Sequence, residues 1–260
     1  MVLVKCINTY YVGTFKVRKF VSVISVITPT IRKEGLEIVR KSLAKQTFRD
    51  FEWIIGAPFD PEIPEAKFVC DDFADGFWSL NRIHNKLFKV TRGELVVSYQ
   101  DWIWTSPSAL QSLWDAYKAT GGCVSGVGDQ YDQLDEYGRP TNKVWDDPRK
   151  REGLGLYECN WEDCEWNFAA TPREAIFKVG GMDERLDFLG FGGDQFQLCE
   201  RMDAMGVKFY LDQNNETRTL RHGRERKDWD DNHVLFNGSY EKRKEELIKS
   251  GQWPQLPYLD

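Results

Sequence analysis

The sequence has no long hydrophobic run. Its longest apolar stretch lies around Val21 to Ile27, whereas a helix that crosses a bilayer needs about 20 apolar residues. The first twenty residues mix Lys, Asn, Thr and Gly and lack the regions of a cleavable signal peptide. We therefore expect a soluble, cytoplasmic protein with no membrane span.

Excess positive charge and ordered cysteine spacings are also lacking. The 260 residues carry 35 Lys and Arg against 41 Asp and Glu, a net charge of -6, which argues against a nucleic-acid-binding domain. The six cysteines are scattered, and Cys159 and Cys164 do not have zinc-knuckle spacing. Most cysteines lie in apolar surroundings, so we expect buried free thiols rather than disulfides.

Strands and helices alternate through the first half of the chain. One helix is marked by an apolar stripe at Leu80, Ile83, Leu87 and Val90. The alternation predicts an α/β fold, a Rossmann-like and mostly parallel central sheet flanked by helices. Ligands of such sheets bind at the carboxyl ends of the strands. The predicted strands are Val21–Thr28, Phe51–Gly56, Lys67–Cys70, Leu95–Tyr99, Cys123–Val127, Trp166–Ala170 and Val207–Leu211.

Capping signals predict two further helix starts. Ser106 precedes Pro107 as an N-cap, and Thr171 to Glu174 has the form of a capping box. The stretch Gly128–Glu165 between them is acidic, rich in Trp, Tyr and Gly, and without periodicity. Loops of that length are usually functional or disordered.

The stretch Asp187–Met202 joins a glycine-rich loop to a helix. Glycines at 190, 192 and 193 allow backbone conformations closed to other residues and a close approach by a ligand. Asp194 follows at the helix N-cap position. It is either a cap alone or a carboxylate that a substrate can reach.

The order of these motifs resembles the glycosyltransferases of GT-A fold. V-I-T-P-T at 26–30, S-L-A-K-Q-T-F-R-D-F-E-W-I-I at 42–55 and G-E-L-V-V-S-Y-Q-D at 93–101 resemble family-two glycosyltransferases. G-F-G-G-D-Q at 190–195 is similar to the G-W-G-G-E-D signature of family-seven galactosyltransferases. T-L-R-H-G-R-E-R-K at 219–227 resembles that family's metal-binding histidine segment.

This resemblance runs from about Val21 to Lys227. It implies a single glycosyltransferase domain over residues 1–260, with a nucleotide-sugar-binding half at about 21–127. An acceptor-binding and catalytic half would follow at about 128–227, then a C-terminal tail with a helix at 228–260. The implied activity is that of an inverting hexosyltransferase. It would move a sugar from a nucleotide diphosphate sugar, UDP-sugar favoured and GDP-sugar possible, to a glycan or other hydroxyl acceptor.

The implied catalytic base is Asp194. The acid that follows it in the family signature is replaced by Gln195, so Asp194 is the one carboxylate there. For each aromatic residue in the implied acceptor site, packing in the core remains the alternative. The implied acceptor-binding residues are Trp166, Phe188, Phe191, Gly192 and Gly193.

The resemblance also implies Mn²⁺, or Mg²⁺, bound to the donor diphosphate by Asp101 and His222. The family's DXD motif is reduced here to Gln100-Asp101-Trp102, with one acid. If no metal binds, the cations around His222 would neutralise the phosphates instead. These cations are Arg218, Arg221, Arg224, Arg226 and Lys227.

The donor nucleotide is expected at the ends of the first strands. The family's acidic pair after the second strand is missing, so either Asp60 or the pair Asp71-Asp72 would recognise the base or ribose. Asn81 and Asn85 either reach the donor or lie on an exposed helix face. The predicted nucleotide-sugar-binding residues are Thr28, Pro29, Thr30, Arg32, Asp60, Asn81, Asn85, Gln100 and Asp101.

Two other functions compete with this prediction. The lost acids at Gln100, Trp102 and Gln195 favour a nucleotide- or carbohydrate-binding module without catalysis. A nucleotidyltransferase ranks below both, because T-P-T-I-R at 28–32 has no glycine for a phosphate loop. The histidines His84 and His233 match no family position and are predicted to be structural.

Overall fold

The computed structural model describes residues 23–72, 80–188, 194–221 and 240–259. The side chains of Phe188 and Asp194 are outside this description. Of the predicted site, Phe191, Gly192, Gly193 and His222 also lie outside the described residues.

Ten strands of the described ranges form one sheet. Its order is β3-β2-β1-β4-β9-β6-β10-β5, with β7 paired to β6 and β8 to β10. The strands are β1 (Ile24–Pro29), β2 (Phe51–Ala57), β3 (Lys67–Cys70), β4 (Leu95–Tyr99), β5 (Ile103–Thr105), β6 (Cys123–Leu134), β7 (Pro140–Trp145), β8 (Leu156–Cys159), β9 (Phe168–Pro172) and β10 (Phe209–Leu220).

The sheet is largely parallel, as predicted, with antiparallel additions. Strand β1 pairs in parallel with β2 and β4, β2 with β3, and β6 with β10. Strand β9 runs antiparallel between β4 and β6. The carboxyl ends of β1, β2, β4 and β6 therefore share one edge with the amino end of β9. Ligands of such sheets bind at that edge.

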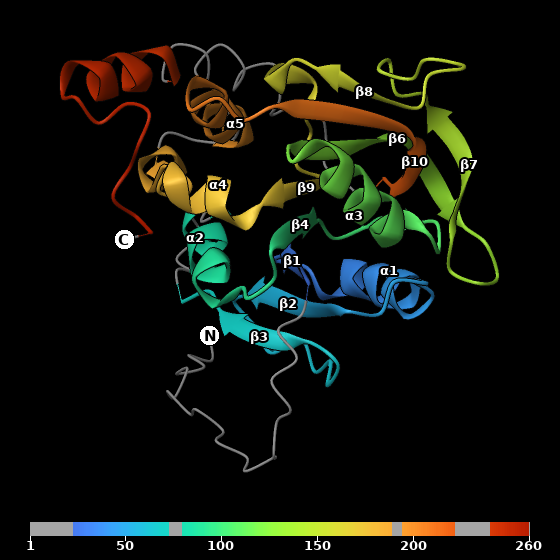
Figure 1. The fold of residues 1–260 in the computed structure, drawn as a ribbon. Coiled ribbons are helices and arrows are strands. Elements are labelled where there is room, and N and C mark those ends of the chain that lie inside the picture. The colour runs from blue at the N-terminus through green and yellow to red at the C-terminus, as the bar shows by residue number, and fades with distance from the viewer. Residues whose placement is uncertain (1–22, 73–79, 189–193, 222–239, 260) are drawn as a thin grey trace.

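Helices cover both faces of the sheet (Figure 1). Leu36, Val39 and Leu113 of α1 and α3 pack in one apolar cluster. Ile83, Ile176 and Leu198 of α2, α4 and α5 pack in the other. The labelled helices are α1 (Lys33–Ala44), α2 (Leu80–Val90), α3 (Ala109–Thr120), α4 (Arg173–Lys178) and α5 (Asp194–Ala204), with short 3-10 turns η1 (Trp161–Asp163) and η2 (Glu184–Phe188). A further helix covers residues 240–249, in the tail where one is predicted. In the described ranges, no helix has the length and apolarity needed to cross a membrane.

Two helix starts and the long loop differ from the prediction. Ser108, not Ser106, is the N-cap of α3, and Thr171 belongs to β9 rather than to a capping box. The stretch 128–165 holds the second half of β6, then β7, β8 and η1. Its strands pair with β6 and β10, so distant partners rather than local periodicity specify them.

His84 is a core residue, consistent with the structural role predicted for it. It is 2% exposed, its Nδ1 lies 2.8 Å from the Leu80 carbonyl oxygen, and its ring packs edge-on against Trp166. Burial lowers the pKa of His84 to about 4, so the ring is neutral at pH 7.

Acid is expected to weaken the fold through His84. An unfolded histidine titrates near pH 6.5, so this stability is complete above pH 6.5 and is lost as the pH falls toward 4. Between pH 7.5 and pH 5.0 the loss is about 2 kcal/mol. Asp187, whose pKa is raised, titrates in the opposite sense, so His84→Leu must be compared with wild type by urea unfolding at both pH values. A difference between the two proteins that stays constant with pH would contradict neutral burial of His84.

Candidate functional site

A buried aspartate and an arginine meet at the carboxyl ends of β1 and β4. Asp101, 7% exposed, accepts the Thr30 hydroxyl at 2.6 Å. Arg32 donates to both of its oxygens, from Nη2 to Oδ1 at 3.0 Å and from Nε to Oδ2 at 3.2 Å. Three of the residues predicted to bind the donor are therefore in direct contact at the predicted edge of the sheet.

The side chains that the structure describes at this site are not arranged to bind a divalent metal. Asp101 is the predicted metal ligand that the structure describes, and both of its oxygens accept bonds from Arg32. A doubly charged ion about 4 Å from that guanidinium would be repelled by roughly 8 kcal/mol at an effective dielectric of 20. Among the described residues, no group of three or more His, Cys, Asp or Glu side chains is placed to hold a metal.

The loop after Asp101 fits closely against α1 and β10. Trp102 has a positive φ of 67°, and a Cβ added at Gly35 would lie 2.7 Å from its Nε1 and 2.9 Å from Cβ of Asp101. A larger residue than glycine at 35 would displace this loop. The Trp102 carbonyl accepts the Leu220 backbone N–H at 2.9 Å, so the end of β10 lies beside the Asp101 loop.

The other residues predicted around the donor differ in exposure. Thr28 is fully buried and its hydroxyl accepts the Trp53 indole N–H at 3.0 Å; Pro29 is also buried. Asp60 is exposed and accepts the Glu62 N–H. The backbone N–H of Gln100 donates to the Asn167 carbonyl. In the alternative pair, Asp71 is buried and Asp72 forms an ion pair with Lys86.

The α2 amides are buried, not on an exposed helix face. Asn81 donates to Asp187 from its backbone and its side chain, both at 2.9 Å, and Asn85 donates to the Met182 carbonyl at 3.0 Å. Asp187 also accepts the Arg82 N–H. Burial raises the pKa of Asp187 to about 6, against the effect of these hydrogen bonds. The amides thus fix the segment that leads into the glycine loop, and a donor contact from them remains a prediction.

The start of α5 lies beside the start of β9. Helix α5 begins at Asp194, and the side-chain oxygen of Gln195 accepts the backbone N–H of Trp166 at 3.1 Å. Trp166 is 2% exposed and packs against Phe88 and His84. Trp166 therefore belongs to the core, and the prediction that its ring forms part of an acceptor platform is corrected.

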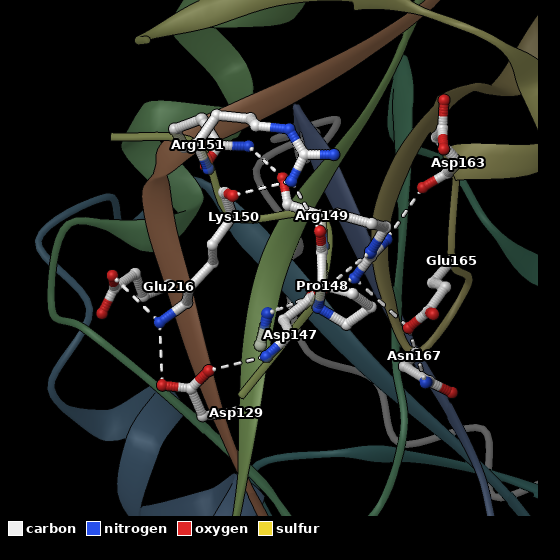
Figure 2. Close-up of polar contacts among 12 residues, drawn as sticks. Asp129, Asp147, Pro148, Arg149, Lys150, Arg151, Asp163, Glu165, Asn167 and Glu216 are labelled. Carbon is white, nitrogen blue, oxygen red and sulfur yellow. Dashed lines mark hydrogen bonds and ion pairs between the residues drawn. The ribbon is translucent and has the colours of Figure 1, made fainter. Parts of the chain in front are cut away.

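An ion-pair network that the sequence did not indicate joins β6 to the segment that precedes β9; Figure 2 shows its side chains. Arg149 holds buried Asp147 through two bonds, from Nε to Oδ1 at 3.0 Å and from Nη2 to Oδ2 at 2.5 Å. It also lies 3.3 Å from Glu165 and donates to the Asp163 carbonyl at 2.8 Å. Asp147 also accepts the Gly128 N–H of β6 at 2.8 Å. The network attaches the 146–165 segment to the sheet edge.

Glu165 is the member of this network that faces solvent most. Its side chain is 41% exposed, against 15% for Arg149 and 1% for Asp147. Partial burial raises the pKa of Glu165, while Arg149 opposes the shift. Glu165 lies two residues before Asn167, whose carbonyl oxygen accepts the backbone N–H of Gln100. An acid directly before the predicted strand 166–170 was the available signal for this carboxylate.

A hollow of about 380 Å³ lies elsewhere on the molecule. It is lined by Cys159, Trp161, Asp203, Lys208 and Phe209, among others. Because Phe209 begins β10, and β10 runs parallel to β6, this hollow lies at the edge opposite to Asp101. It is therefore separate from the candidate site.

The architecture matches solved glycosyltransferases. A structure of GalNAc-T7 with UDP, GalNAc and Mn²⁺ gives a TM-score of 0.58 at 16% identity, over 77% of this chain and 44% of that one. S. aureus TarS 1-349 gives 0.57 at 13% identity, over 76% and 60%. No family model and no curated protein matches the sequence.

This chain therefore has the GT-A fold, as the sequence resemblance predicts. It spans less than two thirds of the length of either of these neighbours. At these identities the likeness defines the fold, and a fold alone does not define an activity.

Proposed function

We propose that the protein is a glycosyltransferase that moves a sugar from a nucleotide diphosphate sugar, with UDP favoured over GDP, to a hydroxyl acceptor. The observation that carries this is the contact of Asp101 with Thr30 and Arg32 at the carboxyl ends of β1 and β4. In a GT-A fold that edge receives the nucleotide sugar. The partly exposed guanidinium of Arg32 is chemically suited to phosphate.

The proposed transfer is an inverting single displacement. An acceptor hydroxyl oxygen bonds to the anomeric carbon on the side opposite the diphosphate. The bond from that carbon to the phosphate oxygen breaks, and its electron pair leaves with the nucleotide diphosphate. The hydroxyl proton passes to the Asp194 carboxylate. Because Asp194 is the first residue of α5, the helix N-terminus favours its ionised form.

No step in this proposal depends on a metal. The Mn²⁺ or Mg²⁺ implied by the resemblance needs Asp101 and His222 as ligands. Asp101 is engaged by Arg32, and His222 lies outside the described residues. The acceptor platform at Phe188, Phe191, Gly192 and Gly193 stays a prediction on the same ground.

A nucleotide- or carbohydrate-binding module without turnover is the second candidate. One observation that favours it is that Gln195 stands where the resembled family has an acid, and that its side chain accepts a hydrogen bond from the Trp166 backbone. It is also favoured by the engagement of both Asp101 oxygens. Both candidates place a nucleotide at the same edge, so turnover separates them.

Release of UDP or GDP from a panel of nucleotide sugars tests the proposal. The reactions contain simple glycosides as acceptors and are run with Mn²⁺, with Mg²⁺ and with EDTA, and His222→Ala is tested beside wild type. We expect release from sugars of one nucleotide, increased by an acceptor. Nucleotide binding without release would favour the binding module. Absence of both would contradict the donor site itself.

A further inference from the structure

We propose that Arg32, anchored by Asp101, takes the place of a divalent metal and neutralises the donor diphosphate. This inference rests on the proposed function, since it assigns a role within the donor site. Asp101 is then a positioning residue for Arg32 rather than a metal ligand.

The first support is the direction in which the charges face. Asp101 is 7% exposed and Arg32 is 27% exposed, so the guanidinium, not the carboxylate, is presented at the sheet edge. A carboxylate that binds a metal needs oxygens open toward the ion. In this pair, the group that a bound ligand would meet is the positively charged guanidinium of Arg32.

The second support is the donor count of Arg32. A guanidinium has five N–H groups in a planar fork, and two of them hold Asp101. Within the described ranges, no residue accepts a hydrogen bond from Nη1 of Arg32. The Thr30 hydroxyl fixes the same carboxylate at 2.6 Å and the Arg32 backbone N–H at 2.9 Å. The guanidinium is therefore held in one orientation with N–H groups left for a phosphate.

The third support is that no second acid stands next to Asp101 in the sequence. The residues on either side of Asp101 are Gln100 and Trp102, and β2 ends at Gly56-Ala57. Because Asp101 has no acidic neighbour in sequence and is itself neutralised by Arg32, the pair has little negative charge with which to attract a divalent ion. The same site attracts a diphosphate.

Calorimetric titration with UDP and GDP tests this role without requiring turnover. Titrations are run in EDTA and with Mn²⁺, and uridine and guanosine serve as ligands without phosphate. We expect one nucleotide to bind in EDTA with a Kd that Mn²⁺ changes by less than about threefold. Arg32→Ala should raise that Kd by on the order of 10- to 100-fold and leave nucleoside binding unchanged.

Lys33→Ala is the matched control, because Lys33 is the adjacent cation, is exposed and is paired with Glu62. It should change the Kd by less than about twofold. Because Arg32→Ala leaves Asp101 buried without its cation, the pair Arg32→Gln with Asp101→Asn is also tested. This neutral pair should fold and lose the same affinity for the diphosphate.

Two results would overturn the inference and leave the donor site standing. One is tightening of nucleotide binding by more than about tenfold on adding Mn²⁺. The other is an effect of both Arg32 variants no greater than that of Lys33→Ala. If neither nucleotide binds under any condition, the proposed function fails together with this inference.

Discussion

Arg149→Ala is expected to lower the free energy of unfolding by about 3–5 kcal/mol. The change removes the cation that holds Asp147, whose side chain is 1% exposed, and leaves an uncompensated buried charge. Burial alone would raise the pKa of Asp147, but the bonds from Arg149 and the Gly128 N–H lower it. Ionised Asp147 therefore stabilises the fold fully at pH values above its ordinary pKa. This stability is lost as the pH falls from that value through the lowered pKa of the folded state. Urea unfolding at pH 7 measures the expected loss.

Arg151→Ala is the matched control for this prediction. Arg151 is exposed, and its guanidinium contacts backbone carbonyls of Pro148 and Lys150 (Figure 2), so its loss should cost within about 0.5 kcal/mol. The double change Arg149→Met with Asp147→Asn should cost less than Arg149→Met alone, because it removes both charges. Equal costs would show that the uncompensated carboxylate is not the source of the loss.

The inner strands of the parallel half of the sheet, β1 and β4, could be predicted because they are buried along their whole length. The limits of β3 and β4 agree with the prediction, and β1 and β2 differ by a few residues at their ends. Buried strands such as β1 and β4 appear in the sequence as largely apolar runs that contain Val or Ile, and they can be recognised without knowledge of their partners. The helical stripe of α2 was predicted for a similar local reason.

The contacts around the site could not be predicted because their partners are distant in sequence. Asp101 and Arg32 are 69 residues apart, and Asn81 meets Asp187 across 106 residues. Position at strand ends correctly brought Asp101 and Arg32 to one edge, but no pattern showed that they would form an ion pair. The Arg149 network lies in the stretch without periodicity, where local patterns carry no information on pairing.

The sequence also did not show which aromatic side chains are buried. Trp166 was predicted in an acceptor platform and is instead 2% exposed. Its place was set by α2 and α5, which bring Phe88 and Gln195 against it. A tryptophan directly before a strand can face either way until the packing of those helices is known.

Asp194→Asn is expected to lower the rate of sugar transfer by about 10²- to 10⁴-fold. Asparagine retains the size of aspartate, so the change removes the charge and basicity of the first residue of α5 and little else. The free energy of unfolding should therefore stay within about 0.5 kcal/mol of wild type. Asp194→Ala should lower the rate at least as much, because it removes the same carboxylate.

Asp203→Asn provides the comparison within the same helix, since Asp203 is exposed near the other end of α5. It should leave both rate and stability unchanged. The two possible roles of Asp194 then give different results with the nucleotide sugar used by wild type. A base predicts a lost rate in a fully stable Asp194→Asn protein with an unchanged Kd for the nucleotide. A purely structural role at the start of α5 predicts an unchanged rate for Asp194→Asn. That result would require the base to be sought among the other carboxylates of this edge, of which Glu165 is partly exposed and near the start of α5.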